Sequence, residues 1–172
     1  MHKLRYSPGD AEAYLRRTLE DLAGDTSVYI LGLGNTDRAD DGAGVLVAEA
    51  LKARFPGRAF SEHDGVEGVV LDIAEKDEHA TVFFVDAGDF PGVPGEITVV
   101  RREAVRDTEV TTHRVAVALM ASLLERAGKG SAVVCIRPQT VGFRARMSKP
   151  VSDSVALLTR VFEAMLEERR AR

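Results

Sequence analysis

The sequence predicts an α/β protein: a three-layer αβα domain whose mostly parallel sheet has about five strands, with an appended helix at the N-terminus. Short apolar runs alternate with longer segments in which apolar residues recur at helical spacing. This alternation is typical of a parallel sheet with helices on both faces. The chain has 172 residues, which fits one domain. Its residues are 45% hydrophobic and 29% charged, which excludes global disorder.

The first third of the chain predicts a helix, a strand and a second helix. Pro8, followed by apolar residues at helical spacing, predicts a helix over 9–23. The apolar run at 28–31 predicts a buried strand. A polar loop at 35–41 then leads into a helix over 42–55, which ends at a Pro-Gly pair.

The middle of the chain predicts a short strand, a short helix and then two further strands. A short strand at 58–63 precedes a helix at 66–76. Residues 81–85 are β-branched or aromatic throughout and form the clearest strand of the chain. After a loop at 88–94, residues 96–100 form a strand that we place nearer an edge, because charged residues follow it directly.

The last third predicts a helix over 113–126, a strand over 132–136 and a final helix over 150–168. The first of these helices is apolar on nearly all sides, so we expect it to be buried on two faces. We divide the chain into an N-terminal helical extension, 1–26, and a single αβα domain, 27–172.

Composition excludes several classes of protein. The net charge is −4, whereas general nucleic-acid binders usually carry a basic face. A single cysteine allows neither an intramolecular disulfide nor a cysteine-rich zinc site. No apolar run reaches the ~20 residues of a membrane helix, and the N-terminus lacks the apolar centre of a secretory signal. We therefore expect a cytoplasmic monomer with no nucleic-acid or membrane partner.

Three residues with metal or acid/base chemistry follow strands or open a helix. Asp41 lies in the loop after the first buried strand, Asp86 follows the 81–85 strand, and His113 begins a helix. Ligands of open α/β sheets bind beyond the carboxyl ends of the strands. We therefore expect the three residues to meet in one crevice, with both carboxylates facing solvent.

Each of the three residues also has a purely structural interpretation. Asp41 precedes a helix and is a candidate N-cap, Asp86 is a candidate turn former, and His113 is a candidate first-turn residue without a ligand. The convergence of all three on one edge of the sheet favours a functional site.

The glycine-rich turn after the first strand suggests a different ligand, a nucleotide. Gly32 and Gly34 match the first two glycines of G-x-G-x-x-G, but Asp37 occupies the third position, where an anion disfavours pyrophosphate. Signatures of other hydrolases and of the P-loop are absent. Cys135 lies within an apolar strand and is interpreted as a packed thiol.

The segment from Leu31 to Val45, with its G-x-G-N, Asp-Asp and G-x-G elements, resembles the opening of the [NiFe]-hydrogenase maturation endopeptidases. The resemblance continues in register through Asp86-Ala87, a Pro/Gly loop, Thr112-His113 and a proline turn at Pro138, and it spans about residues 28–168.

This resemblance implies a three-layer αβα fold and a peptidase that trims the C-terminal peptide of a hydrogenase large-subunit precursor after nickel insertion. The nickel belongs to the substrate and need not be a resident cofactor. The nickel-contacting residues of that family, two acids and a histidine, fall by motif on Asp41, Asp86 and His113, which are also the catalytic candidates. A supporting loop is formed by Gly32, Gly34, Asn35 and Asp40.

The sequence departs from the family pattern in three places, the first being residues 1–27, which have no counterpart in the compact family core. Val66 and Glu67 follow Asp64-Gly65 where a second small residue is usual, and the loop 142–149 is basic, with charges at Arg144, Arg146 and Lys149. The basic loop is either an ordinary solvated loop or a docking patch for an acidic partner. The alternative functions are a non-peptidase metal- or nucleotide-binding αβα module and a hydrolase with a resident zinc.

Overall fold

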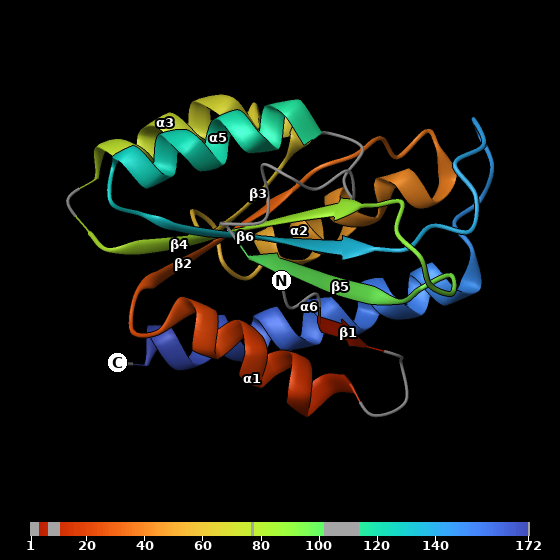
Figure 1. The fold of residues 1–172 in the computed structure, drawn as a ribbon, viewed down its shortest axis with the longest axis horizontal. Coiled ribbons are helices and arrows are strands. Elements are labelled where there is room, and N and C mark those ends of the chain that lie inside the picture. Colours follow the sequence, from red (N-terminus) through yellow and green to blue (C-terminus); the bar gives the residue numbers. More distant parts are fainter. Residues whose placement is uncertain (1–3, 7–10, 77, 102–113, 172) are drawn as a thin grey trace.

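A computed structural model describes residues 4–6, 11–76, 78–101 and 114–171, which form a sheet between two layers of helices (Figure 1). The described strands follow the order β1-β5-β6-β4-β2-β3 across the sheet. Their bounds are β1 (Leu4–Tyr6), β2 (Ser27–Gly32), β3 (Ala59–Ser61), β4 (Ala80–Ala87), β5 (Ile97–Arg101) and β6 (Gly130–Ile136). β2, β3, β4 and β6 are mutually parallel, and β5 is antiparallel to both β6 and β1. The expected mostly parallel αβα fold is confirmed.

The helices divide between the two faces of the sheet. α1, α2 and α6 cover one face, whereas α3 and α5 cover the other (Figure 1). Their bounds are α1 (Ala11–Ala23), α2 (Ala43–Lys52), α3 (Val66–Glu75), α5 (Arg114–Arg126) and α6 (Lys149–Arg170), with 3-10 turns at Ala39–Gly42 and Glu62–Asp64.

Successive side chains of the central strands point to opposite faces of the sheet and so contribute to two separate cores. In β4, Phe83 and Val85 point into the core under α6, while Val82 and Phe84 point into the core under α3 and α5. Strands covered on both faces read as continuous apolar runs, which is why these strands are visible in the sequence. The Phe83 ring packs against Phe162 of α6, with 5.7 Å between the ring centroids.

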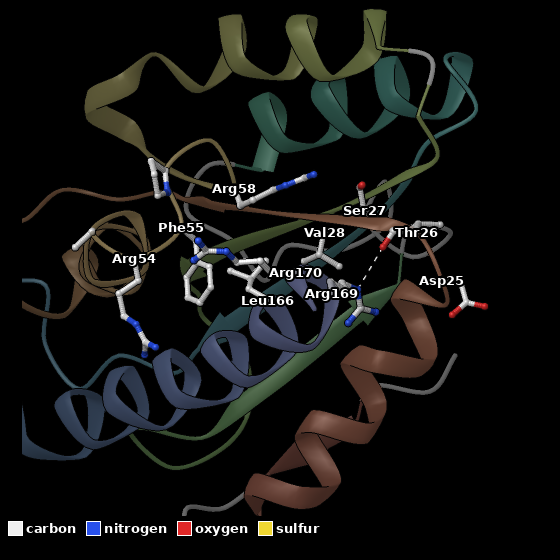
Figure 2. Close-up of a pocket in the computed structure, with 12 residues that line it drawn as sticks. Asp25, Thr26, Ser27, Val28, Arg54, Phe55, Arg58, Leu166, Arg169 and Arg170 are labelled. Atoms are coloured by element: carbon white, nitrogen blue, oxygen red, sulfur yellow. Dashed lines mark hydrogen bonds between the residues drawn. The ribbon is translucent and has the colours of Figure 1, made fainter. Parts of the chain in front are cut away.

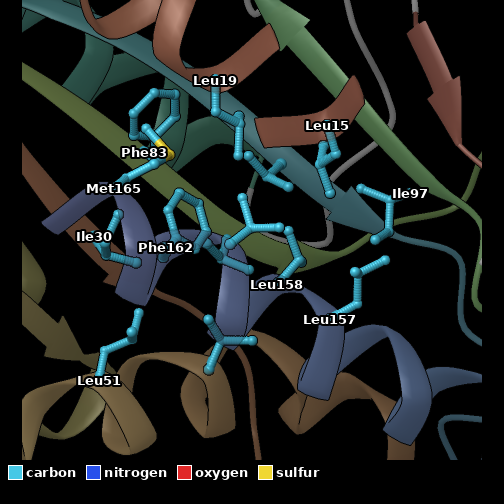
Figure 3. Close-up of a cluster of buried hydrophobic side chains, with 14 of the residues drawn as sticks. Leu15, Leu19, Ile30, Leu51, Phe83, Ile97, Leu157, Leu158, Phe162 and Met165 are labelled. Carbon is cyan, nitrogen blue, oxygen red and sulfur yellow. The ribbon is translucent and has the colours of Figure 1, made fainter. Parts of the chain in front are cut away.

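The N-terminal helix shares the first of these cores. Leu15 and Leu19 of α1 are fully buried and point toward the apolar face of α6, which carries Leu158 and Phe162 (Figure 3). Ion pairs between α1 and α6, such as Arg160 with Glu12, border this contact. α1 therefore packs on the domain itself.

Three features differ from the sequence-based expectations. β1 was not predicted: it adds to the outer side of β5, so β5 lies second from the edge. α5 is buried on one side only, because Val115 and Leu119 are each 68% exposed. The second helix ends at Lys52 and begins with a 3-10 turn. Within the described residues, no helix is both long and apolar enough to cross a membrane.

Candidate active site

The candidate site lies where the strand order reverses. The chain leaves β2 to form β3 on one side of it and returns to form β4 on the other side. Because β2 and β4 are parallel, their carboxyl ends lie at one edge of the sheet. Open α/β sheets bind ligands at such a switch point, and the segment 33–42 leaves β2 there.

Glycines allow the segment after β2 and the start of α2 to approach the strand ends closely. A Cβ built on Gly44 of α2 would lie 2.5 Å from the carbonyl oxygen of Leu33 and would also overlap that of Val85. A Cβ on Gly32 would lie 2.6 Å from the Cβ of Ala48. Only glycine fits at these two positions, and the close packing places the 3-10 turn that carries Asp41 against β4.

Asp41 and Asp86 are both buried at this edge, which corrects the expectation that they face solvent. Asp86 is 0% exposed and Asp41 is 8% exposed. Asp86 lies within β4 opposite Cys135 of β6 and is therefore no turn residue. Asp41 is not the N-cap of α2, because that position is Gly42. Both aspartates make interactions within the protein. The structural interpretations offered for the two aspartates thus fail.

His113, the third expected member of the site, lies outside the described residues, as does Thr112. Where the structure is described, no three His, Cys, Asp or Glu side chains gather as a metal-binding group. The grouping of Asp41, Asp86 and His113 therefore stays a prediction.

Asp40 has a role that the sequence does not reveal. Its side chain is completely buried, and its carboxylate accepts hydrogen bonds from the backbone N–H of Gln139, Thr140 and Ser148 at 2.8, 3.0 and 2.6 Å. The Ser148 hydroxyl donates a fourth bond at 2.9 Å. Asp40 thus ties the segment after β2 to the loop between β6 and α6.

Asn35 and Gly34 shape the same turn. The Oδ1 of Asn35 accepts a 2.9 Å hydrogen bond from the N–H of Asp37, which forms an Asx turn. Gly34 has φ +125°, and a Cβ there would lie 3.0 Å from the carbonyl carbon of Asp41. Their support of the loop is therefore conformational, since the Asn35 residue is exposed.

A second acidic group lies beyond β3. Asp64 pairs with Lys52 of α2 and accepts a hydrogen bond from the N–H of Ser61 at 2.9 Å. The Lys52 bond, helped by the Ser61 N–H, lowers the pKa of the Asp64 carboxyl. Asp64 is thus an ionised structural carboxylate that holds the turn after β3 to α2.

A cavity of about 680 Å³ lies at the amino ends of the parallel strands, away from the carboxyl ends that carry the candidate site. It is lined by the start of β2, the end of α6 and the segment after α2 (Figure 2). Its Arg169 donates to the carbonyls of Gly24 and Thr26, and Arg54 pairs with Glu163 and Glu167 of α6. These arginines connect α6 to the segments on either side of the cavity, which is remote from Asp41 and Asp86.

Comparison with known proteins finds similarity to hydrogenase maturation proteases. It is 30% identical over 129 residues to the hydrogenase 3 maturation protease of Escherichia coli K12, a match covering 73% of this chain and 82% of that protein. No protein-family model matches the chain.

Solved structures agree. The [NiFe] hydrogenase maturation protease HycI from Thermococcus kodakarensis KOD1 superimposes with a TM-score of 0.70 at 26% identity, covering 87% of this chain and 99% of that one. The solution structure of the endopeptidase HycI from Escherichia coli gives a TM-score of 0.64 at 25% identity, covering 78% and 87% of the two chains.

Proposed function

The chain belongs to the hydrogenase maturation protease family, and on that premise we propose that it removes the C-terminal peptide of a nickel-loaded [NiFe]-hydrogenase large-subunit precursor. The protein is a peptidase of the hydrolase class. The specific substrate, its nickel and the residues that recognise the nickel are the proposed part.

The burial of Asp41 and Asp86 at the switch point carries this proposal. Carboxylate oxygens and imidazole nitrogens are ligands that divalent metal ions accept, and here the glycine packing brings the segment bearing one aspartate against the strand bearing the other. Such an arrangement favours a divalent ion brought to this edge.

We assign the recognition of the substrate's nickel to Asp41, Asp86 and His113. Two carboxylate oxygens and one imidazole nitrogen suit a borderline divalent ion. An ion held by three protein groups keeps further positions for its own ligands in the precursor. Once bound, nickel would supply positive charge that polarises a nearby peptide carbonyl.

We also propose that the enzyme acts in the cytoplasm as a monomer and that residues 1–26 are an accessory element outside the site. Packing of α1 on α6, on one face of the sheet, supports the second point. Gel filtration of the purified protein should give a mass near 18.7 kDa.

The test is a cleavage assay on nickel-loaded and nickel-free precursor, with the mass of the large subunit as the readout. Wild type should cut only the loaded form. Asp41→Asn, Asp86→Asn and His113→Ala should each lower the rate by about 10-fold or more, because metal contacts are lost. Circular dichroism must first show that each variant is folded.

Two outcomes would overturn the nickel assignment. One is equal cutting of both precursor forms, and the other is full activity of folded Asp86→Asn. Stoichiometric zinc in the purified active enzyme would instead support the alternative of a hydrolase with a resident metal.

A further inference from the structure

The loop between β6 and α6 is positively charged, whereas the protein as a whole is negatively charged. Residues 142–149, the last of which begins α6, include Arg144, Arg146 and Lys149 and no acidic residue, although the whole chain has a net charge of −4. Lys149 pairs with Asp153 of α6. Among the described residues, neither Arg144 nor Arg146 has a carboxylate within ion-pair distance, so both cations remain available to a partner.

The loop is held firmly at the candidate site. Its two ends are fixed by the Asp40 carboxylate through Gln139, Thr140 and Ser148. Its tip is fixed by the N–H of Arg144, which donates to the carbonyl of Asp37 at 2.7 Å. A loop fixed at both ends and at the tip presents its side chains without a large entropic cost on binding.

Arg144 occupies a backbone conformation that disfavours it. Its φ is +55°, in a left-handed region that residues with a Cβ rarely adopt and that glycine adopts freely. Its guanidinium lies over the ring of Phe143, 5.3 Å from the centroid, and Phe143 is 66% exposed. Strain of this kind is concentrated at functional positions, and arginine and aromatic residues dominate the energy of binding surfaces.

We propose that Phe143, Arg144 and Arg146 form a docking surface for an acidic segment of the precursor large subunit. A carboxylate of that segment would pair with the guanidinium groups, while an apolar side chain would pack on the Phe143 ring. Because Asp40 ties the loop to the segment that carries Asp41, the docked precursor would lie beside the candidate active site. This inference rests on the proposed function.

The test compares steady-state cleavage of nickel-loaded precursor by wild type and by the double variant Phe143→Ala/Arg144→Gly. Glycine accepts the left-handed backbone, so the loop should keep its shape while losing both side chains. We expect KM to rise about 10-fold or more with kcat within about 2-fold. Added salt should weaken wild-type docking more than that of the variant. Arg170→Ala removes an exposed arginine at the amino ends of the parallel strands and should leave KM unchanged.

Failure of this inference can be separated from failure of the proposed function. If wild type does not cut loaded precursor, both the proposed function and the docking proposal that rests on it are wrong. If wild type cuts and the folded double variant keeps its KM, the docking surface alone is wrong. Should the double variant misfold, Arg146→Ala provides the same measurement away from the left-handed position. Binding of a labelled oligonucleotide is measured alongside cleavage. If wild type binds it, the variants do not, and KM is unchanged, the loop binds nucleic acid and the proposal is overturned.

Discussion

Gly44 shows how the absence of one side chain positions the candidate site. Alanine is the better helix former, yet a Cβ here would overlap the carbonyl oxygen of Val85 and lie 2.5 Å from that of Leu33. Backbone oxygens at the end of a buried strand cannot move aside cheaply. The glycine therefore sets how closely the segment carrying Asp41 approaches β4.

Two glycine-to-alanine substitutions in helices should have opposite effects on stability. Gly44→Ala should lower the free energy of unfolding by about 1–3 kcal/mol through overpacking. Gly68→Ala in α3, where a Cβ would meet nothing within 4 Å, should raise it by about 0.5–1 kcal/mol. Urea unfolding of both variants measures the difference. A stabilising Gly44→Ala would show that the close approach of α2 to the strands is not needed.

At the scale of elements, Asp40 joins two segments that leave different strands. Its carboxylate accepts all four of the hydrogen bonds described above in a fully buried position. A carboxylate is an acceptor at both oxygens, whereas an asparagine amide presents an N–H₂ group at one of them. Asparagine would therefore face a backbone N–H with another donor.

Asp40→Asn should release the loop between β6 and α6. We expect a loss of about 1–3 kcal/mol in the free energy of unfolding and faster tryptic cleavage after Arg144 and Arg146. The control is Asp37→Asn, since Asp37 holds the loop through its backbone carbonyl. Timed digestion with mass detection is the measurement. Equal digestion of the two variants would contradict the role of Asp40.

The sequence predicts the strands that are buried on both faces, because they are continuous apolar runs. It does not predict a strand that is defined only by its hydrogen bonds to a neighbouring strand. β2, β4 and β6 are covered on both faces and appear as continuous apolar segments. β1 has only three residues and is identified as a strand by its hydrogen bonds to β5, so no periodicity reveals it. Asp41 and Asp86 could be placed at one sheet edge because parallel strands end together. Their burial could not be predicted, because it depends on packing between α2 and the strands.

The role of Asp40 was unpredictable for a related reason. Its partners lie 99 to 108 residues further along the chain, and neither spacing nor composition links them. The sequence could identify Asp40 only as a neighbour of Asp41 in the supporting loop.

At the scale of the whole molecule, two carboxylates with lowered pKa values should make the fold sensitive to acid. The bond from Lys52 lowers the pKa of Asp64. A hydrogen bond from the Tyr29 hydroxyl, with a second from Ser27, lowers the pKa of Glu78 against its partial burial. Asp64 follows the carboxyl end of β3, and Glu78 comes just before the amino end of β4. The two groups therefore lie at opposite ends of the parallel strands.

Because both pKa values are lower in the folded protein than in the unfolded chain, both groups stabilise the fold above the unfolded values, about 4. That contribution should be lost as the pH falls below about 4 through the folded pKa values. Urea unfolding from pH 7 to pH 3 should therefore show a falling free energy at the acid end. Lys52→Met removes the partner of Asp64, so its curve should start lower at pH 7 and fall less steeply. An acid limb of equal slope in wild type and Lys52→Met would show that the Lys52–Asp64 pair does not contribute to the acid sensitivity.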